Sequence, residues 1–330
     1  MTVVVTGASG HVGMNLVRAL MADKRPVRAL VHVNHKTLEG LGVEIVEGDI
    51  SDLESLTHAF AGADVVYHLA GVISLLKNEW PLVEKINVQG TRNVIEACRQ
   101  NNVKRLVHFS SIHALQQEPL NIPVDESRPL VDGKRHSPYD RSKAAGQREV
   151  RKAMASGLNA VILNPTGIWG PYDYQPSFFG AALLSMANGK MPALINGGFD
   201  WVDARDVALG AMLAEKKAPA GSEYLLSGHW VSMPEIAKEM KEISDASITG
   251  FVCPMPVARF GAPFATAYSR LSGKRPYYTT VSLAALHSNH NISHEKATRE
   301  LGYQPRPFRE TLTDTLKWYQ QNSDLKCRLK

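Results

Sequence analysis

In the first half of the chain, short apolar runs alternate with stretches whose apolar residues recur every three or four positions. The first pattern is typical of strands in a parallel sheet, and the second is typical of amphipathic helices. The predicted strands cover residues 3–5, 27–31, 43–46, 65–69, 106–110 and 160–163. The predicted helices between them cover residues 11–21, 53–60, 80–100 and 139–156. This alternation predicts βαβ units that build a doubly wound parallel sheet.

The second half is less regular and richer in proline, glycine and aromatic residues. Two later segments, at 234–242 and 308–321, have the pattern of surface helices. We expect an α/β fold with a Rossmann domain at residues 1–165 and a smaller α/β substrate lobe at residues 166–330. Within the lobe, residues 201–226 are expected to return to the Rossmann domain. The length of 330 residues exceeds the size at which a single core usually stops growing, which favours this division.

Composition and charge narrow the class of partner. The net charge is +5, but the basic residues are interspersed with acidic ones, which favours a small phosphate-bearing ligand over nucleic acid. No apolar run reaches the roughly 18 residues of a membrane span, and the chain opens on a predicted strand without a secretion signal. Cys98, Cys253 and Cys327 are widely spaced and predict free thiols. We therefore expect a cytoplasmic enzyme that binds neither membranes nor nucleic acid.

Three glycines, Gly7, Gly10 and Gly13, follow the first predicted strand and open the first predicted helix. Glycine permits a tight turn and a close approach of a ligand to the backbone, while the helix amides and dipole attract a pyrophosphate. A plain strand-to-helix turn is the alternative, but the position at the first βα junction favours a dinucleotide site. The binding residues expected in this loop are Gly7, Ser9, Gly10, His11, Val12 and Gly13.

The end of the second predicted strand bears on which nicotinamide cofactor binds. An NAD site usually has an acidic residue about 20 positions after the glycine loop, where it binds the ribose hydroxyls. This stretch has Arg28 and His32 instead, with His35 and Lys36 just beyond. We expect NADP to be preferred over NAD, with His32 near the extra phosphate; Arg28 equally fits a strand residue that reaches solvent. Asp49 is expected to bind the adenine amino group, with a helix-capping role as the alternative.

Tyr139 and Lys143 lie four positions apart on a predicted helix and therefore share one face. A nearby positive charge stabilises a phenolate, so Lys143 is expected to lower the pKa of Tyr139 toward the range of a general acid and base. Ser110 and Ser111 end a predicted strand, where a hydroxyl can polarise a carbonyl oxygen. These residues predict hydride transfer with Tyr139 as the proton donor or acceptor.

Short motifs extend this pattern over nearly the whole chain. They are TGASGHVG at 6–13, GDI at 48–50, HLAG at 68–71, NVQGT at 87–91, FSS at 109–111, YDRSK at 139–143, NPT at 164–166, WVDARDV at 201–207 and KATRELGY at 296–303. In this order and spacing they resemble the extended short-chain dehydrogenase/reductase family. That family includes nucleotide-sugar epimerases, dihydroflavonol reductases and 3β-hydroxysteroid dehydrogenases.

The resemblance implies roles for individual residues. Ser111 would be the catalytic hydroxyl, Tyr139 the acid and base, and Lys143 the group that holds the nicotinamide ribose. Asn87 would support the helix that carries Tyr139, and a homodimer through this helix and the one starting near Trp80 would be typical of the family. The further cofactor-binding positions that it implies are Ile50, Leu69, Ala70, Gly71, Asn87, Ser110, Asn164, Thr166 and Gly167.

A histidine group and an amphipathic segment near the C-terminus admit other interpretations. His287, His290 and His294 are spaced so that a helix would place them on one face, as a zinc site needs. No carboxylate or thiolate completes that set, and we expect no metal. The segment at 257–271, with its aromatic residues, is expected to pack in the core of the small lobe; a substrate lid or a membrane-surface role is the alternative.

Asp203, Arg205 and Asp206 stand at the start of the stretch expected to return to the first domain. They can be interpreted as substrate contacts. An aspartate that precedes a helix also accepts hydrogen bonds from the free amides of its first turn. We expect a helix cap combined with an ion pair between the lobes.

Two enzyme classes and one non-catalytic class fit these features. A reductase would exchange NADP(H) at every turnover, whereas a nucleotide-sugar epimerase or dehydratase would keep NAD bound and return the hydride to its substrate. A protein that only senses the cofactor would not need Ser111, Tyr139 and Lys143, which are all present. Sugar-nucleotide members commonly have an arginine shortly after the segment equivalent to Trp-Gly-Pro at 169–171, and here tyrosine and aspartate follow instead. We therefore expect reduction of a ketone or aldehyde of a moderately apolar small molecule. The alternative is that Arg205, Arg259, Arg270 or Arg275 reaches a substrate phosphate in the fold.

Overall fold

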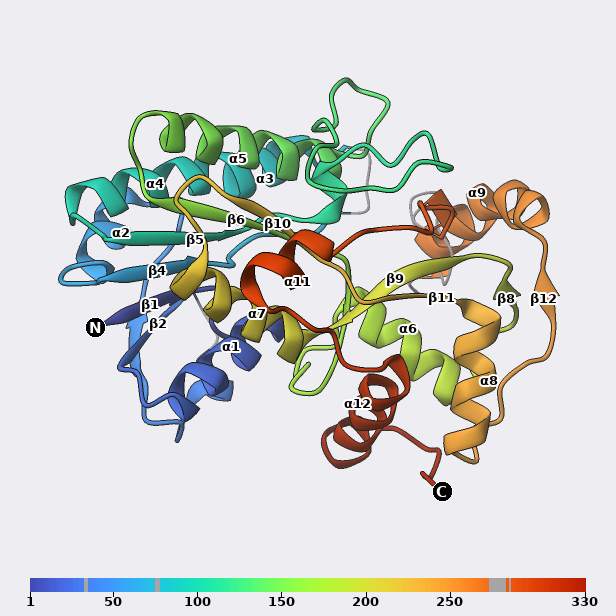
Figure 1. Cartoon of the computed structure of the whole chain (residues 1–330). Coiled ribbons are helices and arrows are strands. Elements are labelled where there is room, and N and C mark those ends of the chain that lie inside the picture. Colours follow the sequence, from blue (N-terminus) through green and yellow to red (C-terminus); the bar gives the residue numbers. More distant parts are fainter. Residues whose placement is uncertain (33–34, 75–77, 273–282, 285) are drawn as a thin grey trace.

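The computed structural model describes residues 1–32, 35–74, 78–272, 283–284 and 286–330. Figure 1 shows a parallel sheet covered by helices, with a second body of smaller sheets and helices beside it. The sheet has seven strands, all parallel to their neighbours. In order across the sheet they are β10 (Glu223–Leu226), β6 (Ala160–Pro165), β5 (Arg105–Phe109), β4 (Val65–His68), β1 (Val3–Thr6), β2 (Val27–Val31) and β3 (Glu44–Glu47). The predicted doubly wound fold is confirmed.

Alternate residues of the strands point into two separate helical layers. On β1, Val3 and Val5 belong to one apolar core and Val4 belongs to the other. The first core lies under α1 (His11–Ala22), α7 (Ala204–Lys217) and α11 (Glu295–Leu301). The second lies under α2 (Leu53–Ala59), α4 (Gly90–Gln100) and α5 (Pro138–Ala155). Burial on both sides explains why these strands read as continuous apolar runs.

The predicted elements of the first half are present, with ends that differ by one or two residues. The predicted helix at 80–100 is the exception, because it consists of α3 (Trp80–Val83), a π-helical segment (Glu84–Gln89) and α4. Helix α5 begins at a capping box in which Ser137 and Asp140 bond to each other's backbone amides. This box determines where the helix that carries Tyr139 and Lys143 starts.

The second body holds the remaining sheets and most of the remaining helices. Its strands are β7 (Gly167–Trp169), β9 (Gly198–Asp203) and β11 (His229–Ser232) in one sheet, and β8 (Leu194–Ile195) and β12 (Val252–Cys253) in another. Its helices are α6 (Phe178–Ala187), α8 (Met233–Ile243), α9 (Met255–Ser272) and α12 (Phe308–Asn322). Because β7 follows β6 after one residue and β9 leads into α7, the chain passes between the bodies close to the ends of the parallel strands.

The junction at the start of α7 has the structural role that we expected. The Asp203 carboxylate accepts a hydrogen bond from the Arg205 amide and caps the helix. The Arg205 guanidinium lies 2.8 Å from the carboxylate of Asp314 on α12. Asp206 accepts from Arg306 at the same distance. The helix cap and the ion pairs between the bodies are therefore confirmed.

The expectation that the segment at 257–271 packs into a core is wrong for the part whose side chains are described. On α9, Val257, Phe260 and Phe264 are 59%, 77% and 65% exposed. They occupy one helical face, and the opposite face presents Ala258 and Ala262 to the lobe. The small alanines bring the helix close, so the larger residues are left outside. Tyr268 lies outside the described side chains.

The expected grouping of His287, His290 and His294 can be compared with the structure. Residues 287–294 do not form a helix, so the three histidines share no helical face: His290 stacks on Trp230 and His294 contacts Thr298. Within the described ranges, no group of three or more His, Cys, Asp or Glu side chains could hold a metal ion.

The three cysteines are free thiols, as expected. Among the helices described, none is long and apolar enough to cross a bilayer.

Candidate active site

The glycine loop folds into a tight cradle between β1 and α1. Gly7 has a φ of +69°, and a Cβ at this position would lie 2.7 Å from the Ala70 amide nitrogen. A Cβ on Gly13 would lie 2.1 Å from the Gly7 carbonyl oxygen. Gly10 is the N-cap residue of α1, and no side chain satisfies the free amides of that helix end. The loop therefore fits a pyrophosphate, which those amides and the helix dipole would bind.

The expected adenosine end of the site lies at the ends of β2 and β3. The exposed His32 ring has its Nε2 3.4 Å from Asp49 Oδ2. Hydrogen bonds from Ser51, together with His32, lower the pKa of Asp49. Asp49 is not a helix cap, because Asp52 caps α2. Arg28 donates to two backbone carbonyls and pairs with Glu44. Because only 18% of its side chain is exposed, it is held by these contacts and does not reach freely into solvent.

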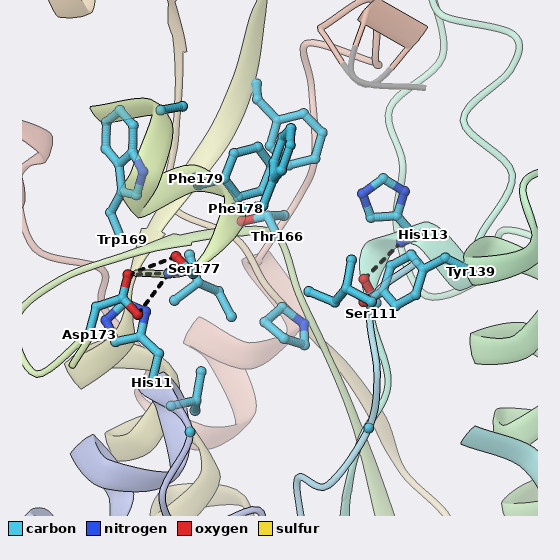
Figure 2. A pocket seen from close by; sticks show the side chains of 18 of the residues that line it. His11, Ser111, His113, Tyr139, Thr166, Trp169, Asp173, Ser177, Phe178 and Phe179 are labelled. Atoms are coloured by element: carbon cyan, nitrogen blue, oxygen red, sulfur yellow. Dashed lines mark hydrogen bonds between the residues drawn. The ribbon is translucent and has the colours of Figure 1, made fainter. Parts of the chain in front are cut away.

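Ser111, Tyr139 and Lys143 come together at the edge of a single cavity of about 390 Å³. Ser111 follows the end of β5, and Tyr139 and Lys143 lie one turn apart on α5. Figure 2 shows Ser111 and Tyr139 side by side on one wall of the pocket. The Lys143 ammonium donates to the Phe109 carbonyl oxygen over 2.9 Å, which fixes the lysine against β5.

Burial changes the proton affinities of both α5 residues. Burial raises the pKa of Tyr139 to about 12, and the hydrogen bond with Ser111 opposes this only in part. Burial also lowers the pKa of Lys143 to about 8. Our expectation that Lys143 lowers the pKa of Tyr139 has the wrong direction, because desolvation of the phenol outweighs its favourable contacts. Tyr139 is therefore protonated at neutral pH and has a proton that it can donate.

Asn87 joins the loop after β4 to the catalytic helix. Its side-chain oxygen accepts from the Val72 amide at 2.8 Å, and its nitrogen donates to the Val72 carbonyl at 2.9 Å. The same nitrogen donates to Ser142 Oγ, whose hydroxyl in turn donates to the Tyr139 carbonyl. Asn87 thus supports the turn that carries Tyr139, as the resemblance implied.

The other predicted residues divide into those that reach the cavity and those that do not. The predicted residues that line the cavity are Gly7, Gly10, His11, Val12, Gly13, Leu69, Gly71, Ser110, Ser111, Tyr139, Lys143 and Thr166. The predicted positions outside its lining are Ser9, His32, Asp49, Ile50, Ala70, Asn87, Asn164 and Gly167. Two of the lining side chains have other partners: Ser110 Oγ donates to Gln147, and Thr166 Oγ1 donates to Asp200.

Sequence reasoning missed how the loop after β7 is held. His11 Nε2 lies 3.1 Å from the Gly170 carbonyl oxygen, and Asn15 donates to the Pro171 carbonyl oxygen at 2.9 Å. Further along, the buried Asp173 carboxylate accepts from Tyr319 on α12 at 2.7 Å. These bonds join residues more than 100 positions apart, so no pattern within a short stretch of sequence predicts them. The bonds of His11 and Asn15 attach α1 to the loop after β7, and the bond of Asp173 attaches the same loop to α12.

The wall opposite Ser111 and Tyr139 is apolar and aromatic (Figure 2). Trp169 stacks on Trp201 with ring centroids 4.1 Å apart. Phe179 packs edge-on against Trp201 at 4.8 Å, and Phe199 completes the cluster. Leucine and methionine side chains from α6 and α8 also line the cavity. The described lining contains no arginine, so its only fully cationic side chain is that of Lys143.

Comparisons with known proteins identify the family of this chain. Residues 3–226 match the NAD dependent epimerase/dehydratase family. The sterol demethylase protein B of Methylococcus capsulatus is 32% identical over 97% of this chain and 99% of its own. A putative dihydroflavonol 4-reductase of Synechocystis is 29% identical, over 98% and 96% of the two chains. The solved structure of gox2253 superposes with a TM-score of 0.86 at 30% identity, over 98% and 99% of the chains. The chain is therefore an NAD(P)-dependent enzyme of the extended short-chain dehydrogenase/reductase family.

Proposed function

We propose that this enzyme reduces a ketone or aldehyde of a moderately apolar substrate, with NADPH as the hydride donor. The observation that carries the proposal is the cavity lining: in the described part of the chain, the wall that faces Ser111 and Tyr139 is aromatic and aliphatic and contains no arginine. An apolar body is stabilised by burial against such a wall, at about 25 cal/mol for each Å² removed from water. A nucleotide-sugar substrate would bring a charged pyrophosphate, which needs cationic partners, and among the described lining residues Lys143 is the only lysine or arginine.

Each polar residue of the catalytic wall has a part in this reaction. Bound NADPH would supply the hydride that reduces the carbonyl carbon. Ser111 would donate a hydrogen bond to the carbonyl oxygen and hold it beside Tyr139. The Tyr139 hydroxyl would give its proton to that oxygen as negative charge develops there. The Lys143 ammonium would stabilise the resulting phenolate and bind the nicotinamide ribose.

The preference for NADP over NAD is part of the proposal. The end of β2 carries His32 in place of an acidic residue, and a carboxylate there would repel the 2′-phosphate of NADP. Asp49 lies 3.4 Å from the His32 ring, so a phosphate bound by His32 would replace or share this contact. Exchanging His32 for alanine should weaken NADPH binding and leave NADH binding nearly unchanged.

The test is to identify and titrate the cofactor. Freshly purified protein is denatured, any released dinucleotide is identified, and the emptied protein is titrated with NADPH and NADH. An empty site that binds NADPH reversibly and tightly, followed by NADPH oxidation on addition of hydrophobic ketones, is the expected result. Retained NAD that exchanges slowly would contradict the proposal and would favour the epimerase alternative.

A further inference from the structure

His113 is a pocket residue that the proposed mechanism does not use. It follows Ser111 by two positions, and its amide donates to Ser111 Oγ at 3.2 Å. Its ring lies edge-on to the Tyr139 ring, with centroids 5.6 Å apart, and is stacked on Phe199 at 5.9 Å. Figure 2 shows the His113 ring beside Tyr139, facing the pocket on the side of Phe178. Any group bound by His113 therefore lies next to a group bound by Ser111 and Tyr139.

Asp140 determines which nitrogen of His113 carries the proton. His113 Nδ1 lies 3.1 Å from Asp140 Oδ1. Burial favours the protonated form of Asp140, but the contact with His113 and the cap bonds of Ser137 outweigh it and lower the carboxyl pKa. An ionised carboxylate only accepts hydrogen bonds, so Nδ1 carries the hydrogen. In the neutral ring, Nε2 is then a hydrogen-bond acceptor.

The Nε2 atom is available to a ligand. The His113 side chain is 29% exposed and lines the cavity. No hydrogen bond to its Nε2 occurs within the described part of the chain. The neighbouring rings of Tyr139 and Phe199 hold the imidazole from two sides, so it is oriented before any substrate arrives. A fixed acceptor on an otherwise largely apolar surface discriminates strongly between ligands with and without a matching donor.

We propose that His113, oriented by Asp140, is a specificity-determining residue that accepts a hydrogen bond from a substrate hydroxyl next to the reacting carbonyl. The substrate class is then a hydroxy ketone or hydroxy aldehyde with an apolar body. This inference rests on the proposed reductase function, since it takes Ser111 and Tyr139 as the groups that bind the carbonyl oxygen. The adjacency of His113 to both residues places the hydroxyl on a neighbouring carbon.

The experiment compares two ketones that differ by one hydroxyl: 1-phenylpropan-1-one and 2-hydroxy-1-phenylpropan-1-one. For the wild type, kcat/KM with NADPH should be about tenfold to hundredfold higher for the hydroxy ketone. His113→Phe keeps a ring against Tyr139 and Phe199 but removes the acceptor. It should abolish the preference by lowering kcat/KM for the hydroxy ketone alone, and His113→Gln, whose amide oxygen accepts, should restore part of it.

Direct binding separates this inference from the proposed function. The affinity of both ketones for the enzyme saturated with NADP⁺ is measured by calorimetry in the wild type and in His113→Phe. Tighter binding of the hydroxy ketone that disappears in His113→Phe supports the role of His113, even if neither ketone is reduced and the proposed function fails. Equal binding of the two ketones by the wild type, or an equal loss for both in the variant, would overturn it and leave the reductase proposal standing. Thermal melting and NADPH titration verify that each variant is folded.

Discussion

The two walls of the pocket are built on different principles. On the sheet side, polar groups have assigned partners: Asn87 bonds to Val72 and Ser142, and Lys143 bonds to the Phe109 carbonyl. On the lobe side, Trp169, Phe179 and their neighbours are held by ring contacts and by burial of apolar surface. The first wall holds its polar groups through directional hydrogen bonds. The second wall provides apolar contact area and a shape that a substrate can fit.

This difference separates the reaction from the choice of substrate. Proton donation requires Tyr139 and Ser111 at defined positions, which a hydrogen-bond network provides. Apolar recognition depends on the area buried, so an aromatic wall can change residue by residue without disturbing the chemistry. Variants of Ser111, Tyr139 and the residues that support them should therefore reduce turnover, and variants of the lobe wall should reduce substrate affinity. His113 is the one residue on the sheet side that we propose to act on substrate affinity.

The largest effect is expected from Tyr139→Phe. This change removes the proton donor and retains the ring, so kcat for carbonyl reduction should fall by about 10²- to 10⁴-fold. The Kd for NADPH should stay within about twofold, because the phenol oxygen alone is removed. Tyr174→Phe, at a 38% exposed tyrosine outside the cavity lining, is the matched control. Normal turnover by Tyr139→Phe would refute the assignment of the proton donor.

A smaller effect, confined to the cofactor, should follow from Gly13→Ala. The added Cβ would lie 2.1 Å from the Gly7 carbonyl oxygen, so the loop must open to accommodate it. The Kd for NADPH should rise by at least about tenfold, since the cradle depends on close backbone contact. Fluorescence titration measures this. Gly261→Ala on α9, where a Cβ meets nothing within 4 Å, is the control, and equal Kd values for the two variants would show that the loop is not the binding site.

On the lobe wall, Phe179→Ala should act on the substrate alone. Losing the contact area of one phenylalanine weakens binding of an apolar ketone by about 1.5 kcal/mol, so KM should rise by about tenfold. The Kd for NADPH and the turnover at saturating ketone should change little. Phe260→Ala removes the same side chain from an exposed site on α9 and serves as the comparison. A loss in kcat with unchanged KM would contradict the claim that the lobe wall acts on substrate affinity and not on turnover.

The mildest expected effect is the pH dependence of reduction. Lys143 has a pKa of about 8, so its charge is present below this value and is lost as the pH rises through it. Since the ammonium stabilises the phenolate that forms, kcat should fall by about fourfold between pH 7 and pH 8.5, following the charged fraction. Tyr139, with a pKa of about 12, stays protonated over this range. A kcat that is constant up to pH 9.5 would contradict the role of Lys143.

Much of the sheet wall could be predicted from the sequence because its determinants are local. The glycine spacing of the cradle and the four-residue spacing of Tyr139 and Lys143 are visible in short windows, and the parallel-sheet pattern brings them to one edge. The burial that raises the pKa of Tyr139 could not be predicted, because it depends on segments distant in sequence. The same is true of Asp173, whose partner Tyr319 lies 146 positions away.

The second body shows where pattern reasoning fails. The periodicity of α9 is clear, but it does not say which face meets the protein. We expected Phe260 to be buried in a core, but in the structure Phe260 is exposed and Ala262 is buried. Likewise, the regular spacing of His287, His290 and His294 suggested a helix that is absent. Aromatic residues are frequent in the second half of the sequence, but only the fold shows that Trp169 and Trp201 stack on each other in one wall of the cavity.

The most direct test of the central claim follows the hydride. The enzyme is incubated with NADPH carrying deuterium at the transferred position of C4 and with an apolar ketone, and the product is analysed by mass spectrometry. Our account predicts one deuterium on the carbinol carbon of the alcohol and one equivalent of NADP⁺ formed with each alcohol. A product without deuterium, or a cofactor that returns unchanged after turnover, would contradict net reduction and point to an enzyme that returns the hydride to its substrate.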